Sequence, residues 1–312
     1  MGDFMKKRLS NRFIGVLVVI GLALSAIFIV PRVVGVEESY TPFNITVTAN
    51  INSLNIDSDH TNMIYTFSYP ASGVDMTRHH VVDPHNFVNL ITYSPRSGIM
   101  SIHTDMPVAF SVENDDETDD VIIRVISLRE VYDRILIIDP GHGGYDVGAP
   151  VAGAYESHIV LAISLYLYEL FQNSNSGIAV FMTRHDDDWV YLRDRSALAN
   201  NLGDLFISIH TNTFPDPSVA GTETLYDTPR SIHLAQIVQQ HLVAELGTRD
   251  RGIIHRSDLY VLNTVHIPAV FVEVDFKTNP TALANLTNSA YQQRVAQALY
   301  RATVEAFEVV AR

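Results

Sequence analysis

Residues 135–150 are the stretch that most constrains how this chain folds. They read ILIIDPGHGGYDVGAP, so four aliphatic residues lead directly into Asp-Pro-Gly-His-Gly-Gly. A continuous apolar run of this kind is typical of a strand that is covered on both faces. The glycines on either side of His142 carry no side chain, which lets backbone or a ligand approach this histidine closely. The stretch therefore predicts a buried strand that runs into a functional loop.

The chain after residue 128 alternates strand-like and helix-like segments. Further apolar strands are predicted at 178–182, 205–209, 222–226 and 269–274. The spacing of apolar residues predicts helices at 157–171, 192–201, 231–246 and over most of 280–310. Strands that alternate with helices are typical of an α/β domain with a mostly parallel sheet flanked by helices. We assign this predicted α/β domain to residues 129–312.

Residues 37–128 show the two-residue period of half-buried strands instead. The segment 43–52, FNITVTANIN, alternates strictly between apolar and polar residues. Shorter β-like segments, which together predict an all-β sandwich-like domain, follow at 63–69, 88–93, 99–103, 108–112 and 121–126. The acidic stretch 113–120 is interpreted as a solvated turn. The alternative, a calcium loop, lacks the ligand spacing of an EF-hand.

The first 36 residues combine a basic end with an uncharged hydrophobic run. Lys6, Lys7, Arg8 and Arg12 precede residues 13–30, which carry no charge. This arrangement predicts a signal peptide or a membrane anchor. The run exceeds an ordinary signal core and no clear A-x-A-like site follows, which favours the uncleaved anchor over secretion. A buried core helix is the third alternative and explains the basic flank poorly. Either exported form places residues 37–312 in the extracytoplasmic cell envelope.

Composition restricts the chemistry that is available to the chain. Its net charge of −14 offers no basic footprint for a polyanion, so we expect no nucleic-acid partner. The absence of cysteine excludes disulfides, a thiolate nucleophile and cysteine-ligated zinc. Any bound metal must therefore be held by histidines and carboxylates.

Four polar residues stand at the ends or edges of predicted apolar strands. They are His142 after the first strand, Glu156 at the start of the next helix, His210 at the end of FISIH, and Glu273 within VFVEV. In open α/β sheets, ligands collect at the carboxyl ends of the strands. Two imidazoles and one carboxylate can hold zinc with one position left for water, and a further carboxylate can take up the proton of that water.

Each of these residues also has an ordinary structural explanation. A single histidine at a strand end is commonly a hydrogen-bonded structural residue, and Glu156 would suit an exposed helix start. Glu273 would also suit a buried ion pair with an arginine such as Arg195. A glycine-rich loop after a strand can hold phosphate, although GHGGYDVG matches neither the dinucleotide-binding pattern nor the P-loop. On spacing alone these alternatives stay open.

Several ordered segments together resemble the zinc-dependent N-acetylmuramoyl-L-alanine amidases of bacterial cell walls, the type 3 amidase family. The resemblance covers residues 134–309. It rests on IDPGHGGYDVGA, AYES, MTRHDDDWVYLRDRSALANNLGDLFISIHTN, GTETLY, LYVLN, PAVFVEVDFKTNP and LTNSAYQQRVAQALYRA. For residues 129–312 the resemblance implies a phosphorylase/hydrolase-like α/β fold.

The resemblance implies one Zn2+ per catalytic domain, bound by His142, Glu156 and His210. It implies Glu273 as the catalytic carboxylate. The reaction it implies is hydrolysis of the amide bond between N-acetylmuramic acid and L-alanine in peptidoglycan, by a zinc-activated water with Glu273 as general base and acid. Asn212 is interpreted as orienting His210, contacting substrate or forming a strand-end turn.

Other residues in the matched segments are given structural roles. Arg184, Asp186 and Arg195 are interpreted as salt-bridge or loop residues. The histidines that occupy no metal position in the family pattern are His158, His185, His233, His241, His255 and His266.

Two residues depart from the family pattern. The family usually has glycine after the VEV segment and an apolar residue two positions later, where this chain has Asp275 and Lys277. An extra carboxylate so near Glu273 predicts a raised pKa of Glu273 through like-charge repulsion, unless Lys277 compensates.

Residues 211–272, between His210 and Glu273, are accounted for by GTETLY, one helix and LYVLN. They leave no room for a long inhibitory segment, so we expect an open site that needs no obligatory activator. Residues 37–128 weakly resemble wall-targeting AMIN-type modules, and a spacer above the membrane is the alternative. Two other functions stay open: a non-catalytic wall-binding protein and an exported metallopeptidase.

Overall fold

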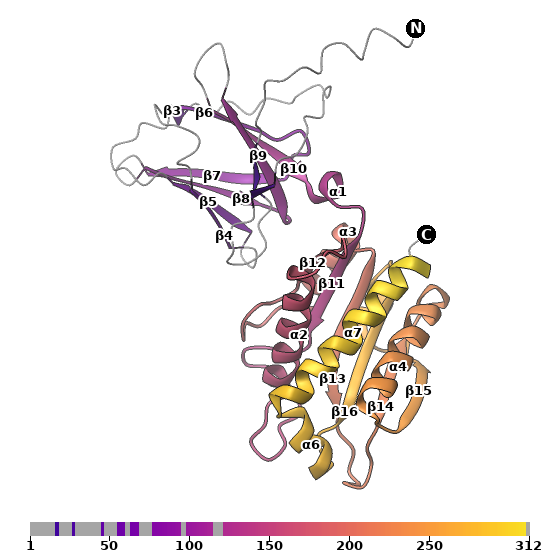
Figure 1. The fold of residues 1–312 in the computed structure, drawn as a ribbon. Helices are drawn as coiled ribbons and strands as arrows, with labels where there is room; N and C mark the ends of the chain where they lie inside the picture. The colour runs from indigo at the N-terminus through magenta and orange to yellow at the C-terminus, as the bar shows by residue number, and fades with distance from the viewer. Residues whose placement is uncertain are drawn as a thin grey trace, which may run out of the picture. The chain divides into compact units, whose positions relative to one another are not determined.

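The computed structural model of the protein describes residues 16–18, 27–28, 45–46, 55–59, 63–68, 77–94, 98–114 and 121–309. The chain divides into two compact units, Met1–Val131 and Tyr132–Arg312. Figure 1 draws both units.

The first unit contains two β-sheets, with strand orders β2-β1-β9-β10-β6-β3 and β4-β5-β8-β7. Its strands are β1 Val16–Val18, β2 Ile27–Phe28, β3 Ile45–Thr46, β4 Asn55–Asp59, β5 Ile64–Ser68, β6 Thr77–Val82, β7 Val88–Ser94, β8 Ile99–Thr104, β9 Val108–Asn114 and β10 Val121–Ser127. The short helix α1, Leu128–Val131, follows them. The strands β1, β2, β4 and β6 were not among the predicted strands.

The two sheets of the first unit share one hydrophobic core. Tyr65, Phe67 and Met100 come from the four-stranded sheet, and Phe110 and Ile123 come from the six-stranded sheet. The ring of Phe110 lies edge-on to Tyr65 and Phe67, with ring centroids 4.8 and 5.1 Å apart. Two sheets whose inner faces interdigitate in this way form a sandwich.

The hydrophobic run at 13–30 lies largely outside the described residues. The structure describes only Val16–Val18 and Ile27–Phe28 within it, and β1 pairs antiparallel with β9. Within the described part of the chain, no helix combines the length and the apolar character that a membrane crossing needs. The predicted acidic turn also lies outside the described residues from position 115 to 120. The signal peptide or membrane anchor therefore stays a prediction.

The second unit is built on a six-stranded sheet with the order β12-β11-β13-β16-β14-β15. Its strands are β11 Ile135–Pro140, β12 Ala179–Met182, β13 Leu205–Asn212, β14 Thr222–Tyr226, β15 Asp250–His255 and β16 Ala269–Phe276. Its helices are α2 Glu156–Gln172, α3 Leu192–Leu202, α4 Ile232–Leu246, α5 Tyr260–Thr264, α6 Pro280–Leu286 and α7 Ser289–Val309, with the 3-10 turn η2 at Pro229–Ser231.

Helices cover both faces of this sheet because its strands are apolar on both sides. Figure 1 shows α2, α7 and α4 side by side over one face, where α7 contacts both neighbours. Leu136 and Ile207 point into that core. The alternate residues Ile137 and Phe206 are fully buried and point to the opposite face. There α3 contacts β11, and α5 contacts β16.

The α/β fold class is confirmed, but the sheet is mixed. The strands β12, β11, β13 and β16 run parallel to one another. The strand β14 runs antiparallel to β16, and β15 runs parallel to β14. Four of these five strand pairings are parallel, so the prediction of a mostly parallel sheet is confirmed. The antiparallel pairing of β14 with β16 was not predicted, because an apolar run does not encode its direction. The strand β15, DRGIIH, was not predicted, since only two of its residues are large and apolar.

Candidate metal centre

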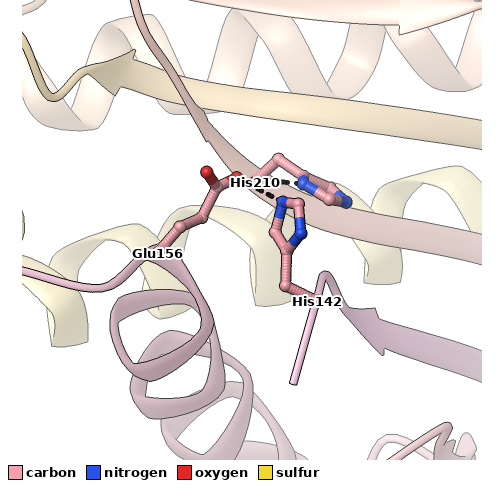
Figure 2. A group of neighbouring side chains, drawn as sticks. All are labelled: His142, Glu156 and His210. Carbon is pink, nitrogen blue, oxygen red and sulfur yellow. Dashed lines mark hydrogen bonds and ion pairs between the residues drawn. The ribbon is translucent and has the colours of Figure 1, made fainter. Parts of the chain in front are cut away.

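The three predicted metal ligands come together at the carboxyl end of the parallel strands. His142 follows β11, His210 lies near the end of β13, and Glu156 is the first residue of α2. One ligand atom from each residue lies within 4.8 Å of the others. Figure 2 shows the two imidazoles and the carboxylate pointing toward one another. In the described part of the chain this is the one group of three or more such side chains that could hold a metal ion.

The distances from the carboxylate of Glu156 to the two imidazoles suit zinc. Oε1 of Glu156 lies 3.2 Å from Nε2 of His142 and 3.0 Å from Nδ1 of His210. With zinc–ligand bonds of about 2.0–2.1 Å in a tetrahedral site, neighbouring donors lie about 3.3 Å apart. Two imidazoles and one carboxylate are also a donor set that zinc takes while keeping a fourth position open. The residues present therefore fit the metal that the sequence predicted.

Two arginines hold the loop that carries His142. His142 has a φ of 60°, which a non-glycine residue rarely adopts. Arg184 donates to the carbonyls of Pro140 and Gly141, at 3.0 and 2.7 Å. Arg195 donates to the carbonyls of Pro140 and His142, at 2.7 and 2.6 Å. Both guanidinium groups are buried, so they supply the hydrogen-bond donors that a strained buried loop would otherwise lack.

Each imidazole has a further contact, outside the metal cluster, that orients its ring. Nδ1 of His142 lies 3.0 Å from a carboxylate oxygen of Asp146, so Nε2 is the nitrogen that faces Glu156. The ring of His210 stacks on Phe271 at 3.8 Å between centroids and 11° between planes. Such outer contacts fix the ring orientation of metal-binding histidines.

Glu156, at the start of α2, is buried where the His142 loop, the end of β13 and the end of β16 meet, and its side chain is 5% exposed. Besides facing the imidazoles, Oε1 accepts a hydrogen bond from the backbone N–H of Thr211 at 3.0 Å. Oε2 accepts one from Nζ of Lys277 at 2.6 Å. The exposed helix-start glutamate that was the alternative for this residue is therefore wrong.

The electrostatic environment favours the metal-binding charge state of Glu156 and of His210, whereas it favours the protonated form of His142 while no metal is bound. Burial alone would raise the pKa of Glu156, but hydrogen bonds from the two imidazoles hold it well below its usual range. Burial lowers the pKa of His210, which keeps this ring neutral. Burial opposes the charge on His142, but hydrogen bonds and charges from Glu156 and Asp146 outweigh it and raise its pKa. A charged carboxylate and a neutral imidazole are the forms that ligate metals.

Glu273 lies beside His210 on the neighbouring strand. The two residues are directly paired in the parallel register of β13 and β16. Oε2 of Glu273 is buried and has no hydrogen-bond partner in the structure. Burial, followed by the charges of Glu156 and Glu223, raises its pKa well above the ordinary value, although Lys277 acts in the opposite direction. The raised pKa therefore does not come from Asp275, as the sequence suggested, but from burial and other carboxylates.

The ion pair that was the alternative for Glu273 is not formed. Arg195 instead pairs with Asp139, at 2.7 Å, and both side chains are at most 3% exposed. Asp139 also accepts hydrogen bonds from Thr183 at 2.6 Å and Ser208 at 2.7 Å. Burial would raise the pKa of Asp139, but Arg195 and the two hydroxyls hold it below its ordinary value.

Two glycines make room for the ligands themselves. A Cβ at Gly141 would lie 2.0 Å from Cε1 of His210. A Cβ at Gly148 would lie 2.6 Å from Cβ of Glu156, and Gly148 has a φ of +69°. The glycine-rich loop is thus needed first of all to let the three side chains converge.

The remaining predicted residues have structural partners. The side-chain amide of Asn212 donates to Oε1 of Glu223 at 2.8 Å, and its Oδ1 accepts from the backbone N–H of Thr213. The side chain of Asn212 therefore does not orient His210. Asp186 accepts from the backbone N–H of Asp188, and its carbonyl accepts from Arg184. Asp275 accepts from the backbone N–H of Gly221 at 2.7 Å and so fastens the β13–β14 connection.

Sequence reasoning missed three residues around the site. Asp146 stands four positions after His142, a spacing that offered a signal for its contact with the ring. Glu223 is buried on β14 opposite Glu273 and pairs with Arg251 at 2.7 Å. Lys277 was noted as a departure from the family pattern, but nothing in the sequence indicated that Glu156, 121 positions away, is its partner.

The family model described as N-acetylmuramoyl-L-alanine amidase, Amidase_3, matches residues 136–305. The chain is 38% identical over 171 residues to an uncharacterized Bacillus subtilis protein, YqiI, a match that covers 53% of this chain and 81% of YqiI. It is 36% identical over 179 residues to the amidase LytC of the same species, where the match covers 56% of this chain but only 36% of LytC.

A solved structure agrees with the sequence relatives. The catalytic domain of CwlV, an N-acetylmuramoyl-L-alanine amidase from Bacillus (Paenibacillus) polymyxa var. colistinus, is 31% identical with a TM-score of 0.54. The match covers 56% of this chain and 99% of that domain. The family model covers more than half of the chain, and every residue of the metal centre lies within it. The chain therefore belongs to the N-acetylmuramoyl-L-alanine amidase family, whose enzymes hydrolyse the bond between N-acetylmuramic acid and L-alanine in bacterial peptidoglycan.

Proposed function

We propose that residues 132–312 form a zinc-dependent peptidoglycan amidase in which His142, Glu156 and His210 hold the metal. The observation that carries this proposal is the convergence of their three donor atoms within 4.8 Å, with both carboxylate–imidazole distances close to the ligand spacing of a tetrahedral zinc ion. When bound, zinc would lower the pKa of a water and polarise the amide carbonyl under attack.

Glu273 is the residue that we assign to proton transfer. Its Oε2 is buried without a partner, beside His210, and is therefore free to accept a proton from water. The same oxygen then donates that proton to the nitrogen of L-alanine as the amide bond breaks, so the leaving group departs as an amine. Glu223, which is paired with Arg251 and Asn212, and Asp275, which accepts from Gly221, are less suited to the role because their oxygens already have partners.

The decisive test is digestion of purified peptidoglycan by the full chain. An amidase releases stem peptides with a new amino terminus on L-alanine, which mass spectrometry identifies. A new amino terminus further along the stem would identify a peptidase instead. Zinc binding without any release would identify a non-catalytic wall-binding protein. A chelator should abolish release, and added zinc should restore it.

We also propose that the chain is exported and that residues 1–36 are retained as an anchor. The basic residues ahead of the hydrophobic run support this orientation. Expression in a bacterium tests it: the full chain should sediment with membranes, and a chain lacking residues 1–36 should not. An intact mass that lacks the leader would contradict the anchor and support secretion.

Residues 37–128 are proposed to bind the wall or to act as a spacer above the membrane. Sedimentation with insoluble peptidoglycan separates the two roles, with Glu273→Gln used to prevent digestion. Loss of co-sedimentation on deletion of residues 37–128 supports wall binding. Unchanged co-sedimentation supports the spacer.

We propose finally that the purified chain is active without a partner. The elements between His210 and Glu273 are β14, η2, α4, β15 and α5, each of which packs in the α/β unit. The related CwlD amidase from Clostridioides difficile, 31% identical with a TM-score of 0.54, was solved in complex with the GerS lipoprotein. A large rise in activity on adding envelope extract to the pure chain would contradict partner independence.

A further inference from the structure

Lys277 is an unusual residue in this chain for two reasons. It is the only lysine after position 7, and every other cation beyond that point is an arginine. Its side chain is also fully buried, with 0% exposed. Buried lysines are rare because an ammonium group loses strong hydration when it leaves water.

The ammonium group of Lys277 contacts two segments beside the metal centre. Nζ donates to Oε2 of Glu156 at 2.6 Å and to the carbonyl of Ala149 at 2.8 Å. The backbone N–H of Lys277 donates to the carbonyl of Asn212 at 2.8 Å. Lys277 therefore ties the end of β16 to the end of β13, to the His142 loop and to the start of α2.

These contacts divide the two oxygens of Glu156 between different partners. Oε1 faces both imidazoles and accepts from Thr211. Oε2 faces Lys277, at the shortest of these distances. A carboxylate with one oxygen held by an ammonium group has a single oxygen left for a metal, and that oxygen carries less negative charge.

Stability alone does not explain this pair. A buried ion pair commonly contributes no more to folding than well-packed apolar residues of similar size. An apolar residue, which the amidase family usually has at this position, would therefore stabilise the fold equally well. What the lysine adds is a positive charge and a hydrogen-bond donor directed at a metal ligand.

We propose that Lys277 is a positioning residue that restricts Glu156 to ligating through Oε1 and weakens the hold of the site on its metal. The ammonium group repels the metal cation and withdraws charge from the ligand. The site would thereby bind its metal less tightly, and the metal would polarise a bound water or carbonyl group more strongly. This inference rests on the proposed zinc site.

Lys277→Met is the direct test, because methionine is also long and unbranched but carries no charge. The full chain is loaded with Co2+, whose visible absorption reports coordination number, and zinc affinity is measured by competition with a chromophoric chelator. We expect Lys277→Met to bind zinc at least tenfold more tightly than the wild type. We also expect weaker visible absorption of the Co2+ form, as Oε2 becomes a second ligand atom.

A purely structural role gives the opposite pattern. If Lys277 only supports packing or loop order, Lys277→Met should lower zinc affinity and leave the Co2+ spectrum of the loaded protein unchanged. The inference is overturned by that result, and also by a variant whose zinc affinity and Co2+ spectrum both equal those of the wild type. Gln239→Leu is the matched control, since Gln239 is a buried polar residue that bonds Thr222 and Thr224, away from Glu156. It should lower stability without altering the spectrum.

Two further variants keep the test decisive. If Lys277→Met does not fold, Lys277→Leu makes the same comparison with the residue type of the family pattern.

Because the chain has no cysteine, Lys277→Cys can be alkylated in denaturant with bromoethylamine and refolded, which restores an ammonium group at nearly the original length. This product should regain the wild-type spectrum and affinity, and failure to do so overturns the inference. A wild-type chain that binds no zinc would instead refute the proposed function.

Discussion

His210 and Glu273 occupy paired positions on adjacent parallel strands, β13 and β16. The first faces Glu156 with Nδ1, and the second directs a buried, unpartnered oxygen into the same region. Strand pairing thus holds the proposed metal ligand and the proposed proton acceptor next to each other without any flexible connection.

Glu273→Gln should keep zinc and lose at least a hundredfold in the rate of muropeptide cleavage. The amide is nearly the same size as the carboxylate but cannot take up a proton, and proton transfer contributes about 10²–10⁴ to such rates. Release of amino-terminal L-alanine and zinc content per chain are the two measurements. Glu305→Gln on α7 is the control, since Glu305 pairs with His241 rather than with the metal cluster, and it should retain cleavage. Full activity in Glu273→Gln would refute its role.

His142→Ala and His210→Ala should each bind zinc at least a hundredfold more weakly than the wild type. Each removes one of three protein ligands and leaves too few to hold the ion. Zinc content after dialysis against a weak chelator measures the loss. His241→Ala serves as the control, since that ring pairs with Glu305 rather than with the metal cluster. Wild-type affinity in both ligand variants would remove the basis of the site.

Gly141→Ala should weaken metal binding and destabilise the fold by about 1–3 kcal/mol. The added Cβ would lie 2.0 Å from Cε1 of His210, so the ring must move. Gly153→Ala is a control in which nothing lies within 4 Å of the new Cβ, although its φ of +80° makes alanine strained there. It should cost about 1 kcal/mol and leave zinc affinity unchanged. Denaturant titration and zinc competition separate the two effects.

Asp139→Asn should destabilise the fold at neutral pH by about 3–5 kcal/mol, because Arg195 would lose its buried partner. The pKa of Asp139 in the folded protein is below its ordinary value, and in the unfolded chain it is about 3.9. The stability that the carboxylate contributes is therefore present above about pH 4 and is lost as the pH falls through the lower, folded value.

The difference in unfolding free energy between wild type and Asp139→Asn should accordingly shrink below about pH 4. Urea titrations at a series of pH values measure it. A difference that stays constant down to pH 2 would show that Asp139 is not held as a buried carboxylate.

Arg184→Met should raise the exposure of the His142 loop and weaken zinc binding about tenfold or more. Its guanidinium donates to the carbonyls of Gly141, Pro140 and Ser157, and no other side chain could replace all of these donors. Hydrogen exchange of residues 141–148 reports the loop directly. Unchanged exchange and affinity would show that Arg195 alone holds the loop.

The local features of this protein could be predicted from the order of its residues. Four aliphatic residues before Asp-Pro-Gly-His fixed β11 and the loop after it, because a run that is apolar at every position must be covered on both faces. The absence of cysteine fixed the kind of metal ligand. The family resemblance, carried by short ordered motifs, selected His142, Glu156, His210 and Glu273 from all the histidines and carboxylates of the chain.

The contacts between distant groups could not be predicted in this way, because they depend on how the elements pack. The direction of β14, the pairing of Arg195 with Asp139 rather than Glu273, and the contact of Lys277 with Glu156 all depend on segments far apart in the chain. Local sequence patterns report which face of an element is buried, but not which element will cover it. The partner of a buried charge is the group that packing places next to it, and the order of the strands and the conformation of the loops determine which group that is.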